Sequence, residues 1–193
     1  MDFETFYAKF SDYIKKYGEY SKEEHKIAEE KITSQKSKGS TQRVFLRNGK
    51  LVVEDVPEKT LSSELPEEIY LFLDQNIEEY LNASAEDRDK VRKACEDNAF
   101  TEFLCKYAYR ANEQLKNTKD PIWLTRGVAA ISIENFWIDF RDVIGYLHEL
   151  HTTSNKIGID PHPIFQRVSA ISSQENPRGG PTPLSEVMKS LAK

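Results

Sequence analysis

Apolar side chains recur at helical spacing along most of the chain, and this pattern predicts a mainly α-helical protein. The first helix is predicted over 2–17, where the apolar stripe is mostly aromatic, and Gly18 is expected to end it. A charged helix with few apolar anchors is predicted to follow. Further helical stretches are expected over 65–82, over 84–115 with a break near Asn98 as an alternative, over 121–155 and from Pro161 onward, with a short helix in the last ten residues.

Local signals indicate where several of these helices begin, end or pack. The segment 84–87 resembles a capping box with Asp in place of the usual Glu, and Asp120 is expected to cap a helix that begins with proline. Gly158 fits the end of a helix. Gly127 and Gly145 lie inside a predicted helix, where each costs about 1 kcal/mol relative to Ala. They therefore indicate close helix contacts or a break.

Residues 43–54 give the clearest local signal, two apolar β-type runs on either side of Asn48-Gly49. Asn-Gly readily adopts the positive φ angles of a type I′ turn, so this segment is predicted to form a β-hairpin with Arg47 opposite Lys50. An isolated hairpin is marginally stable in water. It is therefore expected to pack on the helices or to pair with another strand.

The predicted fold is a helical bundle of five to seven helices with one appended β-hairpin at residues 43–54. A length of 193 residues suits one domain, or one domain with an appendage. The expected organisation is a helical amphipathic and charged segment at 1–38, the hairpin at 39–59, the bundle core at 60–172, and a linker with a short helix at 173–193. That last helix is expected either to dock on the core or to bind a partner.

Negative charge is concentrated in one part of the chain. The formal net charge is −5, yet the window 54–89 alone contains twelve acidic and two basic residues. The rest of the chain is close to balanced. Such a block either forms a solvated helix face or attracts a cationic partner.

Three segments are candidates for a protein-binding surface: the aromatic N-terminal helix, the hairpin edge and the acidic block. Packing on the protein's own bundle is the alternative for each of them. The residues expected to contact a partner are acidic or aromatic: Glu67, Glu68, Asp74, Glu78, Glu79, Phe3, Tyr7 and Phe10. Residues 3–17 also offer a surface for a homo-oligomer.

A metal or catalytic centre is the competing hypothesis. His148 and His151 are spaced i, i+3, so they share a helix face and could ligate one metal ion. Asp139 and Asp142 have the same spacing, and with Glu134 and Glu149 they could supply carboxylates for a cation or a shared proton. The alternative is a polar edge that pairs with a neighbouring helix. Because the sequence has neither H-E-x-x-H nor two Glu-x-x-His motifs, no cofactor is expected.

Other chemistries lack their motifs. The sequence contains no G-x-S-x-G, no G-x-G-x-x-G and no G-x-x-x-x-G-K-[ST]. Dispersed basic residues and a pI near 5.5 argue against a nucleic-acid binder. On one helix, Cys95 and Cys105 would lie about 15 Å apart, too far for a disulfide, and they are expected to be reduced core residues. No stretch approaches the roughly 18 apolar residues of a membrane span, so a cytoplasmic location without membrane contact is expected.

Taken together, the sequence favours a non-catalytic cytoplasmic protein that binds another protein, with a basic partner at the acidic block as its specific form. Small acidic inhibitors of basic nucleases share this size and charge, so an immunity or antitoxin role is one concrete version. The alternative is a helical-bundle metal protein or enzyme centred on Glu134, Asp139, Asp142, His148 and His151.

Overall fold

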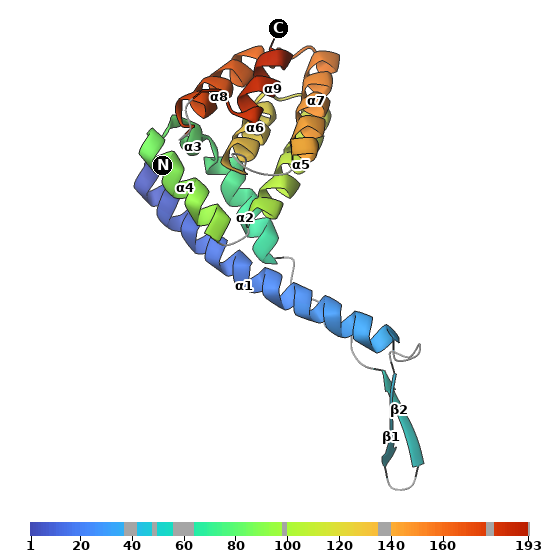
Figure 1. Cartoon of the computed structure of the whole chain (residues 1–193). Helices are drawn as coiled ribbons and strands as arrows, with labels where there is room; N and C mark the ends of the chain where they lie inside the picture. Colours follow the sequence, from blue (N-terminus) through green and yellow to red (C-terminus); the bar gives the residue numbers. More distant parts are fainter. Residues whose placement is uncertain are drawn as a thin grey trace.

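The computed structural model is mainly helical (Figure 1). It describes residues 1–36, 42–47, 50–55, 64–97, 100–134, 140–176 and 180–192, with the side chains of 1–30, 64–96, 100–133, 144–176 and 180–192. The helices are α1 (Phe3–Lys36), α2 (Glu64–Asn76), α3 (Glu78–Asn82), α4 (Ala85–Asp97), α5 (Thr101–Thr118), α6 (Ile122–Glu134), α7 (Phe140–Ile157), α8 (His162–Gln174) and α9 (Pro183–Leu191). Two antiparallel strands, β1 (Gln42–Arg47) and β2 (Lys50–Asp55), pair with Arg47 opposite Lys50.

The described helices are more numerous than the five to seven predicted, because the long predicted stretches are divided. The stretch over 65–82 forms α2 and α3 with a turn at Ile77, the stretch over 84–115 forms α4 and α5, and the stretch over 121–155 forms α6 and α7. The opposite error occurs at Gly18, which does not end the first helix, since α1 continues to Lys36. The aromatic packing of Tyr17 and Tyr20 on either side of Gly18 offsets the cost of an interior glycine.

Several predicted helix ends are confirmed by their hydrogen bonds. The Asp120 carboxylate accepts a hydrogen bond from the Ile122 N–H at 3.0 Å, where α6 begins. At the start of α4 the Asp87 N–H donates to Ser84 Oγ at 3.2 Å. Gly158 ends α7 with a φ of +78°. These contacts span two or three residues, which explains why the sequence alone revealed them.

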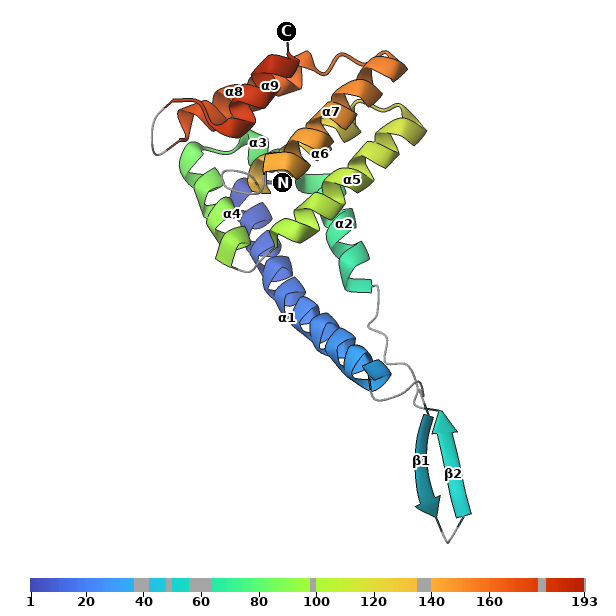
Figure 2. The ribbon, with the colours of Figure 1, turned by 45° about the vertical axis from the view of Figure 1, so that its right-hand side comes forward.

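Helix α6 lies at the centre of the helical body (Figure 2). It contacts α3, α4, α5, α7 and α8, and every residue from 127 to 133 is buried. A helix that is apolar on all sides is stable only when other helices surround it. The helices around α6 are therefore stabilised by packing against all of its sides.

Both ends of the chain contribute to the same hydrophobic core as α6. From α1, Phe6, Phe10 and Ile14 are fully buried, while the C-terminal half of α1 projects beyond the other helices (Figures 1 and 2). From α9, Leu184 and Met188 are buried against α7 and α8. The short C-terminal helix thus docks on its own core, one of the two outcomes that the sequence left open.

Interior glycines differ in their surroundings. A Cβ atom placed on Gly127 would lie 2.3 Å from the hydroxyl oxygen of Tyr146, so the predicted close contact is confirmed there. For Gly145 the same prediction is wrong, because a Cβ atom there would meet nothing within 4 Å. Gly145 is exposed on α7 and interrupts nothing.

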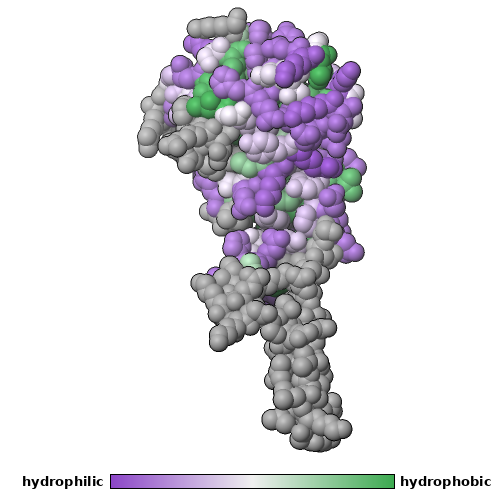
Figure 3. All heavy atoms as spheres, turned by 90° about the vertical axis from the view of Figure 1, so that its right-hand side faces the viewer, coloured by the Kyte–Doolittle hydropathy of each residue, from purple (hydrophilic) through white to green (hydrophobic). Residues whose placement is uncertain are grey.

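The described surface is predominantly polar. Figure 3 shows hydrophobic side chains only in small separate patches on the face that it presents. Among the described residues, the large hydrophobic side chains that are exposed are Met1, Leu71 and Tyr109. None of the described helices has the length and apolar character required to span a membrane.

Raising the pH above 10 is expected to destabilise this fold. Burial raises the pKa of Tyr80 to about 12, and burial also raises the pKa of Tyr107 and of Tyr146. In the unfolded chain these phenols titrate near a pKa of about 10. The unfolded state therefore loses its protons first, and stability is lost as the pH rises from about 10 through the folded-state pKa values.

Because three buried tyrosines have raised pKa values, the free energy of unfolding should fall by about 4 kcal/mol per pH unit above a pH of about 10. Denaturant titrations between neutral pH and pH of about 11 would measure it. Tyr80→Phe should reduce the slope by about a third. A free energy of unfolding that stays constant across this range would contradict the prediction.

Candidate functional site

Helix α2 belongs to the acidic block that the sequence singled out, and one side of it is exposed. The segment 64–82 carries six carboxylates and no Lys or Arg. On α2 the exposed positions are spaced three, four or one residue apart and form one face, which we call the α2 face: Glu64, Glu67, Glu68, Leu71 and Gln75. Leu71 is 56% exposed at the middle of this face, with carboxylates on its N-terminal side.

Three of the five acidic residues predicted to contact a partner are instead bound within the chain. Asp74 accepts hydrogen bonds from the Tyr107 hydroxyl at 3.0 Å and from Arg110 at 3.3 Å. Glu78 lies 3.8 Å from Arg126, and Glu79 pairs with the N-terminal ammonium group at 3.1 Å. These carboxylates hold helices together, so they are less able to bind a partner.

Glu67 and Glu68 differ from these residues. Both are exposed, and neither forms an ion pair with any residue whose side chain the structure describes. They belong to the first turns of α2, where the partial positive charge of the helix N-terminus stabilises carboxylates. The acidic residues that remain open to a partner are therefore Glu67 and Glu68 of the α2 face.

The aromatic candidates of α1 face the core. Phe10 is fully buried and stacks with Phe6 at 5.4 Å between ring centroids, so its prediction as a contact for a partner is wrong. Phe3 and Tyr7 are half-buried and stack with each other at 6.0 Å. An aromatic stripe at helical spacing cannot by itself distinguish a core face from a docking face. In this structure the aromatic stripe of α1 packs in the hydrophobic core.

The two histidines of the competing metal hypothesis have different surroundings. His148 is exposed, whereas the His151 ring stacks on His162 of α8 at 6.2 Å and on Phe165 at 6.4 Å. The structure thus brings together His151 and His162, a residue that the sequence did not single out. Within the side chains that the structure describes, no group of three or more His, Cys, Asp or Glu residues is placed to hold a metal ion.

Three of the four carboxylates of that hypothesis lie outside the side chains that the structure describes. Asp139 lies outside the described residues, and the side chains of Glu134 and Asp142 do as well. The fourth, Glu149, accepts hydrogen bonds from Asn112 and from Lys116, each at 2.9 Å. This one carboxylate therefore links α7 to α5, and the metal or enzyme hypothesis stays a prediction.

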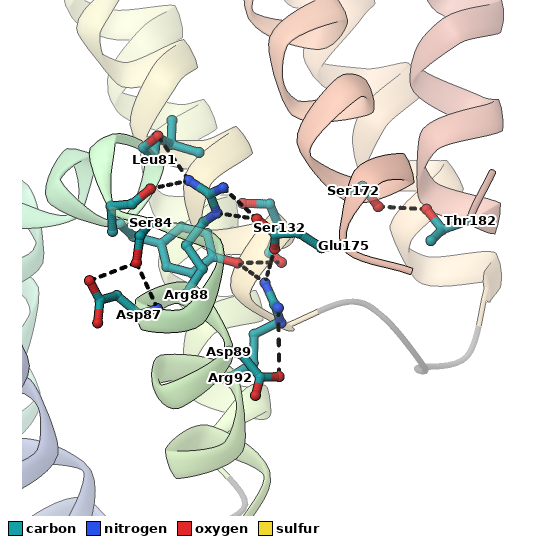
Figure 4. A network of polar contacts seen from close by, with 12 residues as sticks. Leu81, Ser84, Asp87, Arg88, Asp89, Arg92, Ser132, Ser172, Glu175 and Thr182 are labelled. Carbon is teal, nitrogen blue, oxygen red and sulfur yellow. Dashed lines mark hydrogen bonds and ion pairs between the residues drawn. The ribbon is translucent and has the colours of Figure 1, made fainter. Parts of the chain in front are cut away.

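A buried ionic network joins α4 to the end of α8, and the sequence pattern did not predict it (Figure 4). Arg88 Nε donates to Glu175 at 2.6 Å, and Arg92 donates to the other carboxylate oxygen at 2.7 Å. The Glu175 side chain is only 5% exposed. Since the two arginines share one carboxylate, removal of Glu175 would leave two buried guanidinium groups without it.

Neutral groups complete the network. Arg88 also donates to the carbonyl oxygen of Ala83 at 2.5 Å. Arg92 donates to the Tyr80 hydroxyl at 3.0 Å, and that hydroxyl donates to the Ser132 carbonyl oxygen at 3.4 Å. The network thus connects α3, α4, α6 and the end of α8. The network stabilises the packing of these helices because its polar groups are hydrogen-bonded to one another.

A signal for this network exists in the sequence. Arg88 and Arg92 fall on the same helix face as Val91 and Cys95, which belong to the predicted apolar stripe. Arginine on the apolar face of a helix indicates a buried charge with a partner. Its partner, Glu175, lies more than eighty residues away and has no comparable signal.

Comparison with protein-family models, with curated proteins and with solved structures finds no match to this chain.

Proposed function

We propose that the protein has no catalytic role and binds a basic protein partner through the α2 face. The observation that carries this proposal is the exposed position of Glu67 and Glu68 beside Leu71, in a segment that contains no Lys or Arg. Carboxylates around an exposed apolar side chain attract a cationic surface and provide an anchor for it. Cys95 and Cys105 are not joined in a disulfide, which agrees with the proposed cytoplasmic location.

Apolar contact and charge are expected to contribute to partner binding in different ways. Full burial of a Leu side chain contributes about 1.5–3 kcal/mol, and Leu71 is half exposed before binding. Exposed carboxylates at the rim of an interface mainly raise the association rate and make it depend on salt. A basic nuclease held by a small acidic inhibitor, as in immunity or antitoxin pairs, is one version of this proposal.

Reversing the charge of the α2 face is the test. Wild-type protein and Glu67→Lys/Glu68→Lys would be immobilised, and proteins retained only by the wild type at low salt would be identified and purified. Titration calorimetry with that purified partner is expected to show at least tenfold weaker binding by the variant. Wild-type binding should also weaken as salt rises.

The matched control is Glu24→Lys/Glu30→Lys, which makes the same charge change at exposed positions in the C-terminal half of α1. Circular dichroism would verify that both variants fold. If the α2 variant and the control retain the same proteins, with affinities that do not depend on salt, the proposal is wrong.

A further inference from the structure

The strands β1 and β2 form a sheet of two strands, which we call the β1–β2 sheet. Figures 1 and 2 show it beyond the helical body, past the C-terminal end of α1. In the part of the chain that the structure describes, neither strand pairs with a third one. Two strands alone are marginally stable in water, and the unpaired N–H and C=O groups of an open edge are a template for a further strand. A second chain would have to supply that strand.

The register of the two strands assigns apolar residues to both faces of the sheet. Four of them share one face as two directly opposite pairs, Val44 with Val53 and Leu46 with Leu51. On the other face Phe45 lies opposite Val52. A small sheet with apolar faces becomes stable when it gains strands, because the apolar face grows with them.

The sequence of β2 is complementary to itself when two copies run in opposite directions. Lys50 begins the strand, three apolar residues follow, and Glu54 comes next. When Val52 lies opposite its own equivalent in an antiparallel copy, Leu51 lies opposite Val53. One position farther out, Lys50 lies opposite Glu54. Each apolar residue of this run then meets an apolar residue and each charge meets its opposite, which stabilises a pair of strands.

Other registers of β2 lack this match. A two-fold axis perpendicular to the sheet keeps each face on its own side, so only residues of the same face can lie opposite each other. An axis at Val53 sets Leu51 opposite Asp55, and the next pair likewise joins an apolar residue to a carboxylate. An axis at Leu51 leaves Glu54 beyond the end of the partner strand. The axis at Val52 is therefore the favoured one.

The edge of β1 does not match itself in this way. An axis at Phe45 sets Arg43 opposite Arg47 of the second copy. Like charges directly opposite each other destabilise an antiparallel pair. Of the two open edges, the edge of β2 is thus the one that is complementary to a second copy.

We propose that β2 pairs antiparallel with β2 of a second copy of this chain around a two-fold axis at Val52. The product is a four-stranded sheet in the order β1–β2–β2–β1. Lys50 of each copy lies opposite Glu54 of the other, at two equivalent positions. The contact uses no residue of the α2 face. The inference is therefore independent of the proposed function, and the dimer would present the α2 face twice.

Sedimentation equilibrium of the full chain over a wide concentration range tests the association. Wild type is expected to show a monomer–dimer equilibrium. Lys50→Glu should raise the dissociation constant about tenfold or more, since it sets like charges opposite each other at both positions. The same substitution sets a carboxylate opposite Arg47 within the chain's own sheet, which favours the β1–β2 pairing. Loss of the dimer would therefore not result from loss of the sheet.

Arg47→Glu is the matched control, because it makes the same charge change on β1 and sets a carboxylate opposite Lys50. It should leave the dissociation constant nearly unchanged. Glu54→Lys should weaken the dimer as Lys50→Glu does. An equal mixture of these last two variants should associate again, because both positions then join opposite charges.

A cysteine at the two-fold axis tests the register. Directly opposite residues of antiparallel strands have Cα atoms about 4.5–5.5 Å apart, within the range of a disulfide. Val52→Cys should therefore form a disulfide-linked dimer under mild oxidation. Val44→Cys on β1 is the matched control, since at least three strand spacings of about 4.8 Å separate it from its equivalent. Wild type measures the background from Cys95 and Cys105.

Three outcomes would overturn the inference. The first is a wild type that is monomeric at all concentrations, or a dimer that is equally tight in Lys50→Glu. The second is equal cross-linking of Val52→Cys and Val44→Cys. The third is growth of oligomers beyond the dimer, since these require both edges of the sheet. None of these outcomes changes the expected effect of Glu67→Lys/Glu68→Lys on partner binding.

Discussion

Replacing Glu175 with Gln is expected to lower the free energy of unfolding by about 3–5 kcal/mol. Glu175 is the one carboxylate that binds both Arg88 and Arg92, and its side chain is 5% exposed. Gln has nearly the same shape, so the loss arises from the two buried guanidinium charges and not from a cavity. Urea denaturation of the wild type and the variant would measure it.

A second substitution tests whether charge is the cause. Arg88→Met in the Glu175→Gln background removes the guanidinium that has lost its carboxylate, whereas Arg92 keeps Asp89 at 3.7 Å, so part of the stability should return. As a control, Glu113→Gln changes an exposed carboxylate that pairs with Lys116 at 2.7 Å, and its expected cost is below about 1 kcal/mol. If Glu175→Gln costs no more than this control, the network does not stabilise the fold.

Replacing Gly127 with Ala is expected to lower the free energy of unfolding by about 2 kcal/mol. The added Cβ atom would lie 2.3 Å from the Tyr146 hydroxyl, which is fully enclosed and donates to the Ala108 carbonyl oxygen at 3.0 Å. The tyrosine must therefore move and weaken that hydrogen bond. The loss outweighs the gain of about 1 kcal/mol in helix propensity.

Removal of the Tyr146 hydroxyl should relieve the clash with the added Cβ atom. In a Tyr146→Phe background the hydroxyl is absent, and the next ring atom lies 3.6 Å from the added Cβ, an ordinary contact distance. Gly127→Ala should then cost nothing or stabilise the protein. Gly145→Ala provides the matched control, since it meets no atom within 4 Å and should stabilise the protein by about 1 kcal/mol. Equal effects at the two glycines would refute this account of α5, α6 and α7 packing.

Acidic residues of one block had different roles that no sequence pattern distinguished. Asp74 and Glu68 lie six residues apart in the same acidic block, yet Asp74 is bound by Tyr107 and Arg110 while Glu68 stays exposed. The partners of Asp74 come from α5, more than thirty residues later. The candidate site could therefore be narrowed from the whole acidic block to the α2 face only after the helices were packed.

One useful signal in the sequence was not used. Leu71 lies off the apolar stripe of its helix, which runs through Ile69, Phe72, Leu73, Ile77 and Tyr80. A large apolar residue on the polar side of an amphipathic helix is a candidate surface contact. That reasoning would have selected Leu71 in preference to Phe10, which lies on the buried stripe of α1.

The sequence by itself determined the helical class and several helix ends, because these depend on side-chain spacing and on hydrogen bonds between residues two or three apart, as at Asp120 and Ile122. The tertiary structure alone decided which carboxylates are paired, why Gly127 and Gly145 differ, and that Glu175 joins two arginines of α4. Such contacts join segments far apart in the chain. Their energies depend on how the helices pack, and the local pattern of residues does not encode that packing.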